Sequence, residues 1–111
     1  MITFDDEGDE YHSLDGRLHR LDGPAVIRHT GTKSWYRHGS LHRDGEPAIN
    51  HSDGSKSWYQ NGLLHREDGP AVEWSNGANY WYLGGKSIQV RSLEEFLECV
   101  RIWQVQNVLE A

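Results

Sequence analysis

Short apolar runs alternate with glycine-containing pairs along most of the chain. The runs "PAVIRH" and "KSWYRH" lie on either side of Thr30-Gly31, and similar runs flank Asp53-Gly54 and Asn76-Gly77. β-Branched and aromatic runs around such a pair are typical of a β-hairpin whose two central turn residues both take a positive φ. A second glycine turn follows each aromatic run, at His38-Gly39, Asn61-Gly62 and Gly84-Gly85. The pattern therefore predicts consecutive hairpins, connected as a meander of antiparallel strands.

This hairpin pattern recurs with a period of 23 residues. The recurring positions include a histidine followed by an arginine, at His19-Arg20, His42-Arg43 and His65-Arg66. Proline, alanine, glycine and Trp-Tyr positions keep the same spacing. We expect one domain over residues 1–111, with an incomplete first repeat at 1–18 and full repeats at 19–41, 42–64 and 65–87.

A helical pattern replaces the hairpin pattern after Val90. Ser92 and Glu95 have the spacing of a capping box, and helical spacing of apolar residues follows. We predict one α-helix over residues 92–110, which completes a mainly β fold of stacked hairpins in a single sheet. One apolar stripe, expected to cover a face of the sheet, consists of Leu93, Phe96, Leu97, Val100, Trp103 and Val108. A second stripe consists of Ile102, Val105 and Leu109.

The repeated unit resembles the MORN repeat family. The resemblance is carried by a glycine turn, an aromatic strand, an Asn-Gly pair, two further residues and then a histidine, over about residues 8–86. MORN units typically carry glycines in the aromatic strand and after the histidine, where this chain has "SWYR" and "HRxDGPA". The chain is more similar to a variant of bacterial and phage proteins that ends in "WYLNGK" and an "EEF" helix; here the sequence is "WYLGGKSIQVRSLEEFLE". The resemblance implies an elongated antiparallel sheet that serves as a scaffold, a partner-binding module or a lipid-contact module.

The acidic balance of the chain argues against a general attraction to nucleic acid or anionic membrane. Its 111 residues include 11 Lys or Arg and 17 Asp or Glu, for a net charge of -6. The single cysteine, Cys99, allows no internal disulfide and is compatible with a reducing compartment. No apolar run approaches the roughly 18 residues of a membrane span, and "MITFDDEGDE" lacks the features of a secretory signal. These observations favour a cytoplasmic protein.

The recurring histidines are a poor metal site. Equivalent side chains in neighbouring hairpins are expected about 10 Å apart, whereas metal ligands converge on one point. Each histidine also precedes an arginine, whose positive charge opposes a cation. We interpret the His-Arg pairs as structural residues that bond to the acids of the following turn, namely Asp22, Asp68 and, in the middle repeat, Asp44 or Glu46. No metal or cofactor is expected.

The repetition also argues against catalysis. A nucleophile and its base normally form a unique constellation, but the candidate His, Ser, Asp and Arg residues here have equivalents in other repeats. The glycines occur singly at turn spacing, and no glycine cluster opens a helix as in a phosphate-binding loop. We predict that the protein is not an enzyme and that Cys99 is a structural thiol.

Two surfaces are candidates for binding a partner. Adjacent residues of a strand point to opposite faces, so the Trp-Tyr pairs predict a row of Trp35, Trp58 and Trp81 on one face and a row of Tyr36, Tyr59 and Tyr82 on the other. An exposed aromatic row is suited to recognition, although it can also pack along its own sheet. The second candidate is the acidic stretch of Asp5, Asp6, Glu7, Asp9 and Glu10, which either imitates phosphates or is a solvated turn.

These observations favour a protein-binding module, such as a phage-type inhibitor or adaptor that acts on a host protein. The alternative is a structural or membrane-associated scaffold of the MORN type, which the acidic charge disfavours. The second helical stripe, Ile102, Val105 and Leu109, leaves three partners open: a second copy in a homodimer, the target protein, or the repeats of the same chain.

Overall fold

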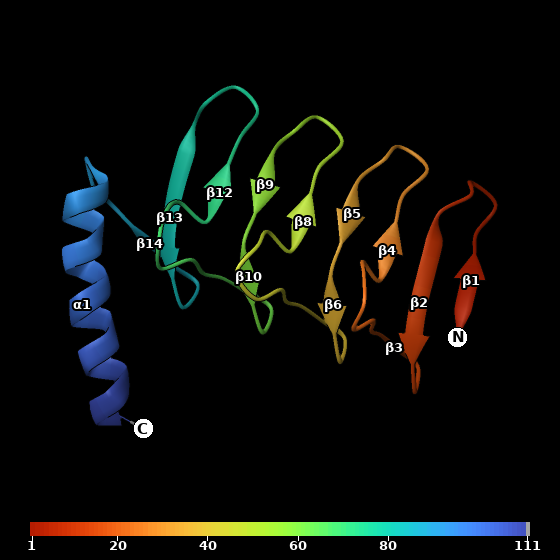
Figure 1. Ribbon diagram of the computed structural model, residues 1–111, viewed down its shortest axis with the longest axis horizontal. Coiled ribbons are helices and arrows are strands. Elements are labelled where there is room, and N and C mark those ends of the chain that lie inside the picture. Colours follow the sequence, from red (N-terminus) through yellow and green to blue (C-terminus); the bar gives the residue numbers. More distant parts are fainter. Residues whose placement is uncertain (111) are drawn as a thin grey trace.

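The protein folds as a row of β-hairpins closed at one end by a helix (Figure 1). The computed structural model describes the backbone of residues 1–110 and the side chains of residues 1–108. The strands are antiparallel throughout this part, so the predicted mainly β meander with one C-terminal helix is confirmed. The molecule measures 46 × 36 × 19 Å along its principal axes, which is the shape of a thin plate.

The strands are short, and most contain two residues. They are β1 (Ile2–Phe4), β2 (Glu10–Leu14), β3 (Arg17–Leu18), β4 (Val26–Ile27), β5 (Lys33–Ser34), β6 (Tyr36–Arg37), β7 (Ser40–Leu41), β8 (Ile49–Asn50), β9 (Lys56–Ser57), β10 (Tyr59–Gln60), β11 (Leu63–Leu64), β12 (Val72–Glu73), β13 (Asn79–Leu83) and β14 (Lys86–Ile88). The main sheet has the order β1-β2-β4-β5-β8-β9-β12-β13-β14, with β3 paired to β2. The pairs β6-β7 and β10-β11 form two small hairpins of their own.

The middle aromatic strands are divided at their tryptophans, so the described residues form fourteen short strands. The N–H of Trp35 donates to Ala48 O (2.7 Å), and its carbonyl accepts from His42 N (3.1 Å). Trp58 makes the equivalent bonds to Ala71 and His65. Each tryptophan thus bonds on one side to the residue before the next strand of the main sheet, and on the other side to the residue after its own small hairpin. The ladder is divided at this point.

The two rows of turns differ in backbone conformation. In the turns at Thr30-Gly31, Asp53-Gly54 and Asn76-Gly77 only the glycine has a positive φ, so the expectation of two positive values is wrong there. The bonds Gly31 N to Arg28 O and Arg28 N to Thr32 O, both 2.9 Å, define a three-residue loop in which glycine forms a bulge. Two positive φ values occur in the other row, for example at His38 (51°) and Gly39 (86°).

Helix α1 (Leu93–Glu110) packs against the last hairpin and begins as expected. The N–H of Glu95 donates to Ser92 Oγ (3.1 Å), which satisfies one of the free amides of the first turn. Phe96 and Val100 are buried against Leu83, and Trp81, Cys99 and Trp103 surround them. The predicted covering stripe is therefore only partly correct, because Leu93, Leu97 and Val108 are exposed.

Candidate partner-binding surface

Cross-strand pairing assigns the side chains to two faces of the sheet. Val26 lies opposite Ser34, Ser34 opposite Ile49, Ile49 opposite Ser57 and Ser57 opposite Val72. Because paired residues share a face and alternate residues return to it, this face also carries Tyr36, Tyr59 and Tyr82. We call it the tyrosine face. The opposite side, which carries Trp35, Trp58 and Trp81, is called the tryptophan face.

Arginines of the protein itself cover the tryptophan face. The guanidinium of Arg43 lies 3.8 Å from the ring centroid of Trp35, and that of Arg66 lies 3.8 Å from that of Trp58. A planar guanidinium over an indole ring is the most favourable cation-π arrangement that side chains offer. In both copies the arginine follows its tryptophan by eight positions, so the contact repeats with the sequence. The sequence analysis did not predict this stacking.

Hydrogen bonds fix the three recurring arginines, two of which lie over tryptophan rings. Arg20, Arg43 and Arg66 each donate to the carbonyl oxygen of a proline four residues later, at 3.2, 3.2 and 3.1 Å. They also bond to acids of the following turn: Arg20 to Asp22 (3.0 Å), Arg43 to Glu46 (2.9 Å) and Arg66 to Asp68 (2.8 Å). Arg66 additionally reaches Glu73 at 3.2 Å.

Each recurring histidine joins the end of one short hairpin to the glycine turn of the next short hairpin. Nδ1 of His19, His42 and His65 accepts the backbone N–H of His38 (2.9 Å), Asn61 (3.0 Å) and Gly84 (2.8 Å), respectively. An accepting Nδ1 leaves Nε2 to carry the proton in the neutral ring. Nε2 contacts Asp44 at 3.1 Å in His42 and Glu67 at 3.0 Å in His65. Each ring therefore stabilises the second glycine turn of its own 23-residue repeat.

The two ends of the row replace the Arg-Trp contact in different ways. Moving back 23 positions from Trp35 gives His12, which contacts Nη1 of Arg20 through Nε2 at 3.1 Å and Glu10 at 2.6 Å. At the other end, the ring of Trp81 packs against Phe96 of α1, with centroids 4.6 Å apart. The helix thus occupies the place that an arginine occupies inside the row.

On the tyrosine face the guanidinium of Arg28 lies 5.7 Å from the ring centroid of Tyr11, but among the described residues no guanidinium or helix stacks on Tyr36, Tyr59 or Tyr82. A shallow hollow of about 450 Å³ lies on it, lined mainly by aromatic and aliphatic side chains: Ile49, His51, Ser57, Tyr59, Leu64, Val72, Trp74, Tyr80 and Tyr82. Partial burial raises the pKa of the Tyr59 phenol, and the neighbouring Tyr36 and Tyr82 reinforce the shift. Trp74 and Tyr80 at the rim are exposed. The lining is mainly apolar, and its polar groups come from the tyrosine hydroxyls, the tryptophan N–H, His51 and Ser57.

A larger hollow of about 600 Å³ lies on the tryptophan face between Arg43, Arg66 and Trp103. Its charged groups are already bonded within the fold, since Glu67 accepts from His65 (3.0 Å) and from Gln104 (2.8 Å). Bonds from His65 and Gln104 lower the pKa of Glu67, as expected for a carboxylate held by donors. A ligand here would have to displace these bonds, so the smaller tyrosine hollow is the better binding candidate.

The acidic N-terminal stretch divides into internal and exposed residues. Asp9 is only 3% exposed and accepts from His29 N and Nδ1, both at 2.7 Å, and from Arg28 Nη1 at 3.1 Å. These donors, His29 first, lower the pKa of Asp9 to about 2, and Asp9 in turn raises the pKa of His29. Asp5 accepts the N–H groups of Glu7 and Asp9 in its own turn. Glu10 bonds to His12, which leaves the exposed Asp6 and Glu7 as the acids best placed to meet a partner.

The same turn brings together three groups of the kind that bind metal. One ligand atom each from Glu7, Asp9 and His29 lies within 4.8 Å of the others, a cluster that the sequence analysis missed because it considered only the recurring histidines. The hydrogen bonds from His29 and Arg28 already engage both Asp9 oxygens. A guanidinium at this distance also opposes a cation. The arrangement is therefore that of an internal ion-pair network.

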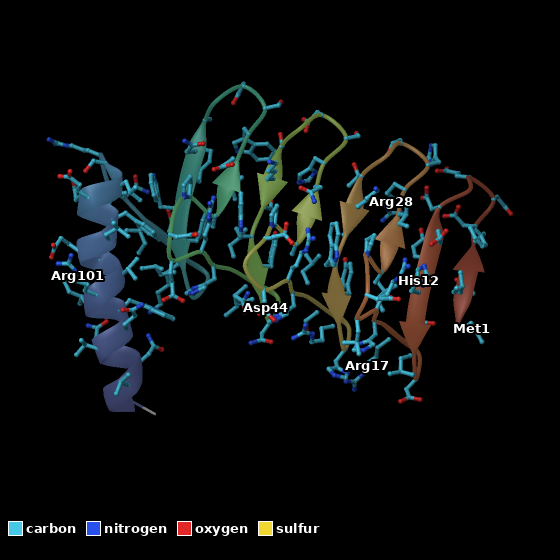
Figure 2. The ribbon with its side chains drawn as sticks, in the orientation of Figure 1. Met1, His12, Arg17, Arg28, Asp44 and Arg101 are labelled. Atoms are coloured by element: carbon cyan, nitrogen blue, oxygen red, sulfur yellow. The ribbon has the colours of Figure 1, made fainter. Side chains whose placement is uncertain are left out.

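The described residues of the second helical stripe are exposed, although Ile102 borders a hollow that Leu63, Leu83 and Ile88 also line. Ile102 and Val105 are 60% and 59% exposed, and the side chain of Leu109 lies outside the described residues. Arg101 lies on the side of α1 away from the sheet in Figure 2, and it pairs with Glu98 at 2.7 Å. Cys99 is half-buried against the helix-hairpin core.

Comparison with protein-family models, curated proteins and solved structures gives no significant match. Among the described residues, α1 does not have the length and apolar character that crossing a bilayer requires.

Proposed function

We propose that the protein is a non-catalytic, cytoplasmic protein-binding module whose tyrosine face contacts the partner. The observation that carries this proposal is the difference between the aromatic rows. Trp35 and Trp58 lie under arginines and Trp81 lies against Phe96, whereas Tyr59 and Tyr82 line an apolar hollow on the other face.

The chemistry of the tyrosine face suits protein recognition. Tyrosine and tryptophan provide large contact areas at a low cost in side-chain entropy, and they are enriched in the centres of interfaces. Tyr80 and Trp74 stand at the exposed rim of the hollow, and Ile49 and Val72 supply apolar area inside it. A partner with a protruding apolar side chain would fit this surface.

The resemblance to MORN-like repeats of bacterial and phage proteins suggests an inhibitor or adaptor that acts on a host protein. The engagement of the recurring histidines in turn-to-turn bonds supports a non-enzymatic role. The alternative is a MORN-like structural or membrane-associated scaffold. The net charge of -6 disfavours an anionic membrane as the binding surface.

A capture experiment with matched variants tests the proposal. Immobilised wild-type protein, a Tyr36→Ser/Tyr59→Ser/Tyr82→Ser variant and a Lys33→Ser/Lys56→Ser variant are incubated with host lysate, and retained proteins are quantified by mass spectrometry. The two lysines are exposed and pair across the sheet with residues of the tryptophan side, so they control for the opposite face. We expect a specific protein to be retained by wild type and the lysine variant, and to be reduced at least about tenfold on the tyrosine variant.

Two results would contradict the proposal. The first is a specific protein that the tyrosine variant retains as well as wild type does. The second is the absence of any specific protein together with co-flotation of the chain with anionic lipid vesicles, which would favour the membrane-associated scaffold. Circular dichroism on the same preparations shows that the variants are folded.

A further inference from the structure

The outer edge of β1 is an unused hydrogen-bonding edge of the main sheet. β1 lies at the end of the row opposite to α1 (Figure 1), and Met1 lies beside it in Figure 2. It pairs with β2 on one side, and among the described residues no strand pairs with its other side. The opposite end of the row is covered by the packing of α1 on β13 and β14.

The direction of the free groups follows from the bonds that are made. Met1 and Ser13 exchange both backbone bonds, at 2.7 and 2.9 Å, and Asp5 N donates to Asp9 O at 3.1 Å. Hydrogen-bonded pairs alternate with non-bonded pairs in an antiparallel ladder, so Thr3 also points its N–H and C=O toward β2. The N–H and C=O groups of Ile2 and Phe4 therefore point outward, away from the sheet.

Equivalent strands inside the row show what such an edge accepts. β1 lies 23 positions before β4 in the repeat, and β4 continues to β8 and β12 with the same spacing. Each of β4, β8 and β12 has an antiparallel strand on both sides. Within the described part of the chain, no strand takes the place beside β1 that β2 takes beside β4. An extended antiparallel strand is the occupant that fits it.

The side chains of β1 are unlike those of a protected edge. Natural edge strands usually carry charges, a proline or a bulge that prevents further pairing. The strand Ile2–Phe4 contains none of these, and Ile2 and Phe4 are 59% and 65% exposed. Both point to the side of His12 and Glu10, their cross-strand partners.

We propose that this edge pairs with β1 of a second copy of the chain, around a two-fold axis at Thr3. The outward groups belong to residues 2 and 4, which are symmetric about residue 3. Ile2 of each copy then faces Phe4 of the other, and each such pair exchanges both of its hydrogen bonds. The apolar side chains of Ile2 and Phe4 pack across the axis. Antiparallel pairing also places the acidic turns at Asp5 to Glu7 of the two copies at opposite ends of the contact, whereas parallel pairing would juxtapose like charges.

The dimer has a consequence for binding. An axis perpendicular to the sheet leaves both tyrosine faces on the same side, so the two rows form one continuous sheet with helices at its outer ends. The contact is short and buries less than the roughly 1,200 Å² of a standard specific interface. We therefore expect a dissociation constant on the order of 10 μM to 1 mM. Two linked tyrosine faces would bind a partner with two sites more tightly than one face does.

Disulfide trapping tests the pairing directly. In a non-hydrogen-bonded antiparallel pair the Cα atoms lie about 4.5 Å apart, which is within disulfide range. Thr3→Cys is placed in a Cys99→Ala background and compared with Leu14→Cys, an exposed position near the same end of the molecule but off the edge. Under mild oxidation at about 100 μM protein, we expect Thr3→Cys to form a covalent dimer at least about tenfold faster than Leu14→Cys. Equal rates for the two variants would overturn the proposal.

Sedimentation of the disulfide-free protein gives an independent test. Phe4→Pro removes an outward N–H that β2 does not use, and Phe4→Ala is the matched control that keeps this N–H. We expect a concentration-dependent dimer in wild type, a weaker one in Phe4→Ala and a monomer in Phe4→Pro. A wild type that stays monomeric up to about 1 mM, or a dimer that Val105→Glu abolishes and Phe4→Pro retains, would overturn the proposal. The second result would assign the contact to α1. Neither result bears on whether the tyrosine face binds a protein.

Discussion

Each face of the sheet carries a row of aromatic residues, at neighbouring positions of the same strands, yet the two faces are built differently. On the tryptophan face, Arg43 and Arg66 lie 3.8 Å from the rings of Trp35 and Trp58, and each arginine is fixed by a proline carbonyl and an acid. On the tyrosine face, Tyr59 and Tyr82 line a hollow with Ile49 and Val72. The difference indicates that repetition in the sequence serves stability on one face and leaves the other available for contact.

The largest expected effect comes from removing a tryptophan. Trp58→Ala deletes the half-buried ring under Arg66 in the middle of the row, so we expect a loss near the lower end of the about 3–5 kcal/mol typical of large buried aromatics. Tyr59→Ala, one residue further on, is expected to cost about half as much, because no side chain stacks on its ring. Denaturant unfolding followed by circular dichroism measures both. Equal losses would show that the two faces contribute alike to stability.

Removal of an arginine tests the covering itself. Arg66→Ala removes the cation-π contact and leaves the Pro70 carbonyl without its donor, which we expect to cost about 2 kcal/mol. Arg66→Lys keeps the charge but not the planar group, and we expect it to recover less than half of the loss. Full recovery of stability with lysine would mean that the positive charge at position 66, rather than stacking on Trp58, stabilises the tryptophan face. Thermal melting of both variants at one pH separates these results.

A histidine variant tests the bonds that connect one short hairpin to the glycine turn of the next. His42→Ala leaves the N–H of Asn61 without its acceptor, and the expected loss is about 1 kcal/mol because water replaces part of the bond. Asp44→Ala removes the exposed partner of Nε2 and an exposed ion pair with Arg37 at 3.5 Å, and it should change the free energy of unfolding by less than about 0.5 kcal/mol. A larger effect from Asp44 than from His42 would contradict the assigned role of Nδ1.

A pH-dependent effect is expected in the first hairpin on the tyrosine face. The folded pKa of Asp9 is about 2, below its ordinary value of 3.8, so its carboxylate stabilises the fold above about pH 4. This contribution is lost as the pH falls through the folded pKa. Asp9→Asn should therefore lower the melting temperature at pH 7, and the difference from wild type should shrink toward pH 2. Asp6→Asn, at an exposed position, should follow wild type throughout; a constant Asp9→Asn difference across the pH range would contradict the linkage.

The row of hairpins was predictable because its signals are local and repeated. The period of 23, the glycine turns and the Ser92-Glu95 cap depend on residues close in sequence, and they gave the meander and the start of the helix. The stacking of Arg43 on Trp35 was not predicted, because the arginine lies on the return segment and its direction depends on the backbone after the turn. Counting back 23 positions from Trp35 to His12 would have shown that the incomplete first repeat has a histidine in place of the tryptophan.

The candidate site was less predictable than the fold. Strand alternation placed Tyr36, Tyr59 and Tyr82 together, but the sequence did not indicate which aromatic row the protein itself covers. Asp9 was grouped with exposed acids because its burial depends on His29, twenty residues away, which no short-range pattern reveals. The predicted covering stripe of α1 included too many residues, because only the side of the helix near Phe96 and Val100 contacts the last hairpin.

The most direct test of the difference between the faces measures stability and partner binding on the same two variants. Once a captured partner is purified, its affinity is determined by calorimetry for wild type, Tyr59→Ser and Arg66→Ala, each at a temperature where the variant is fully folded. We predict that Tyr59→Ser weakens binding at least about tenfold with a small loss of stability, and that Arg66→Ala lowers stability by about 2 kcal/mol with binding unchanged. The opposite pattern, in which Arg66→Ala abolishes binding and Tyr59→Ser does not, would contradict the assignment of the tyrosine face.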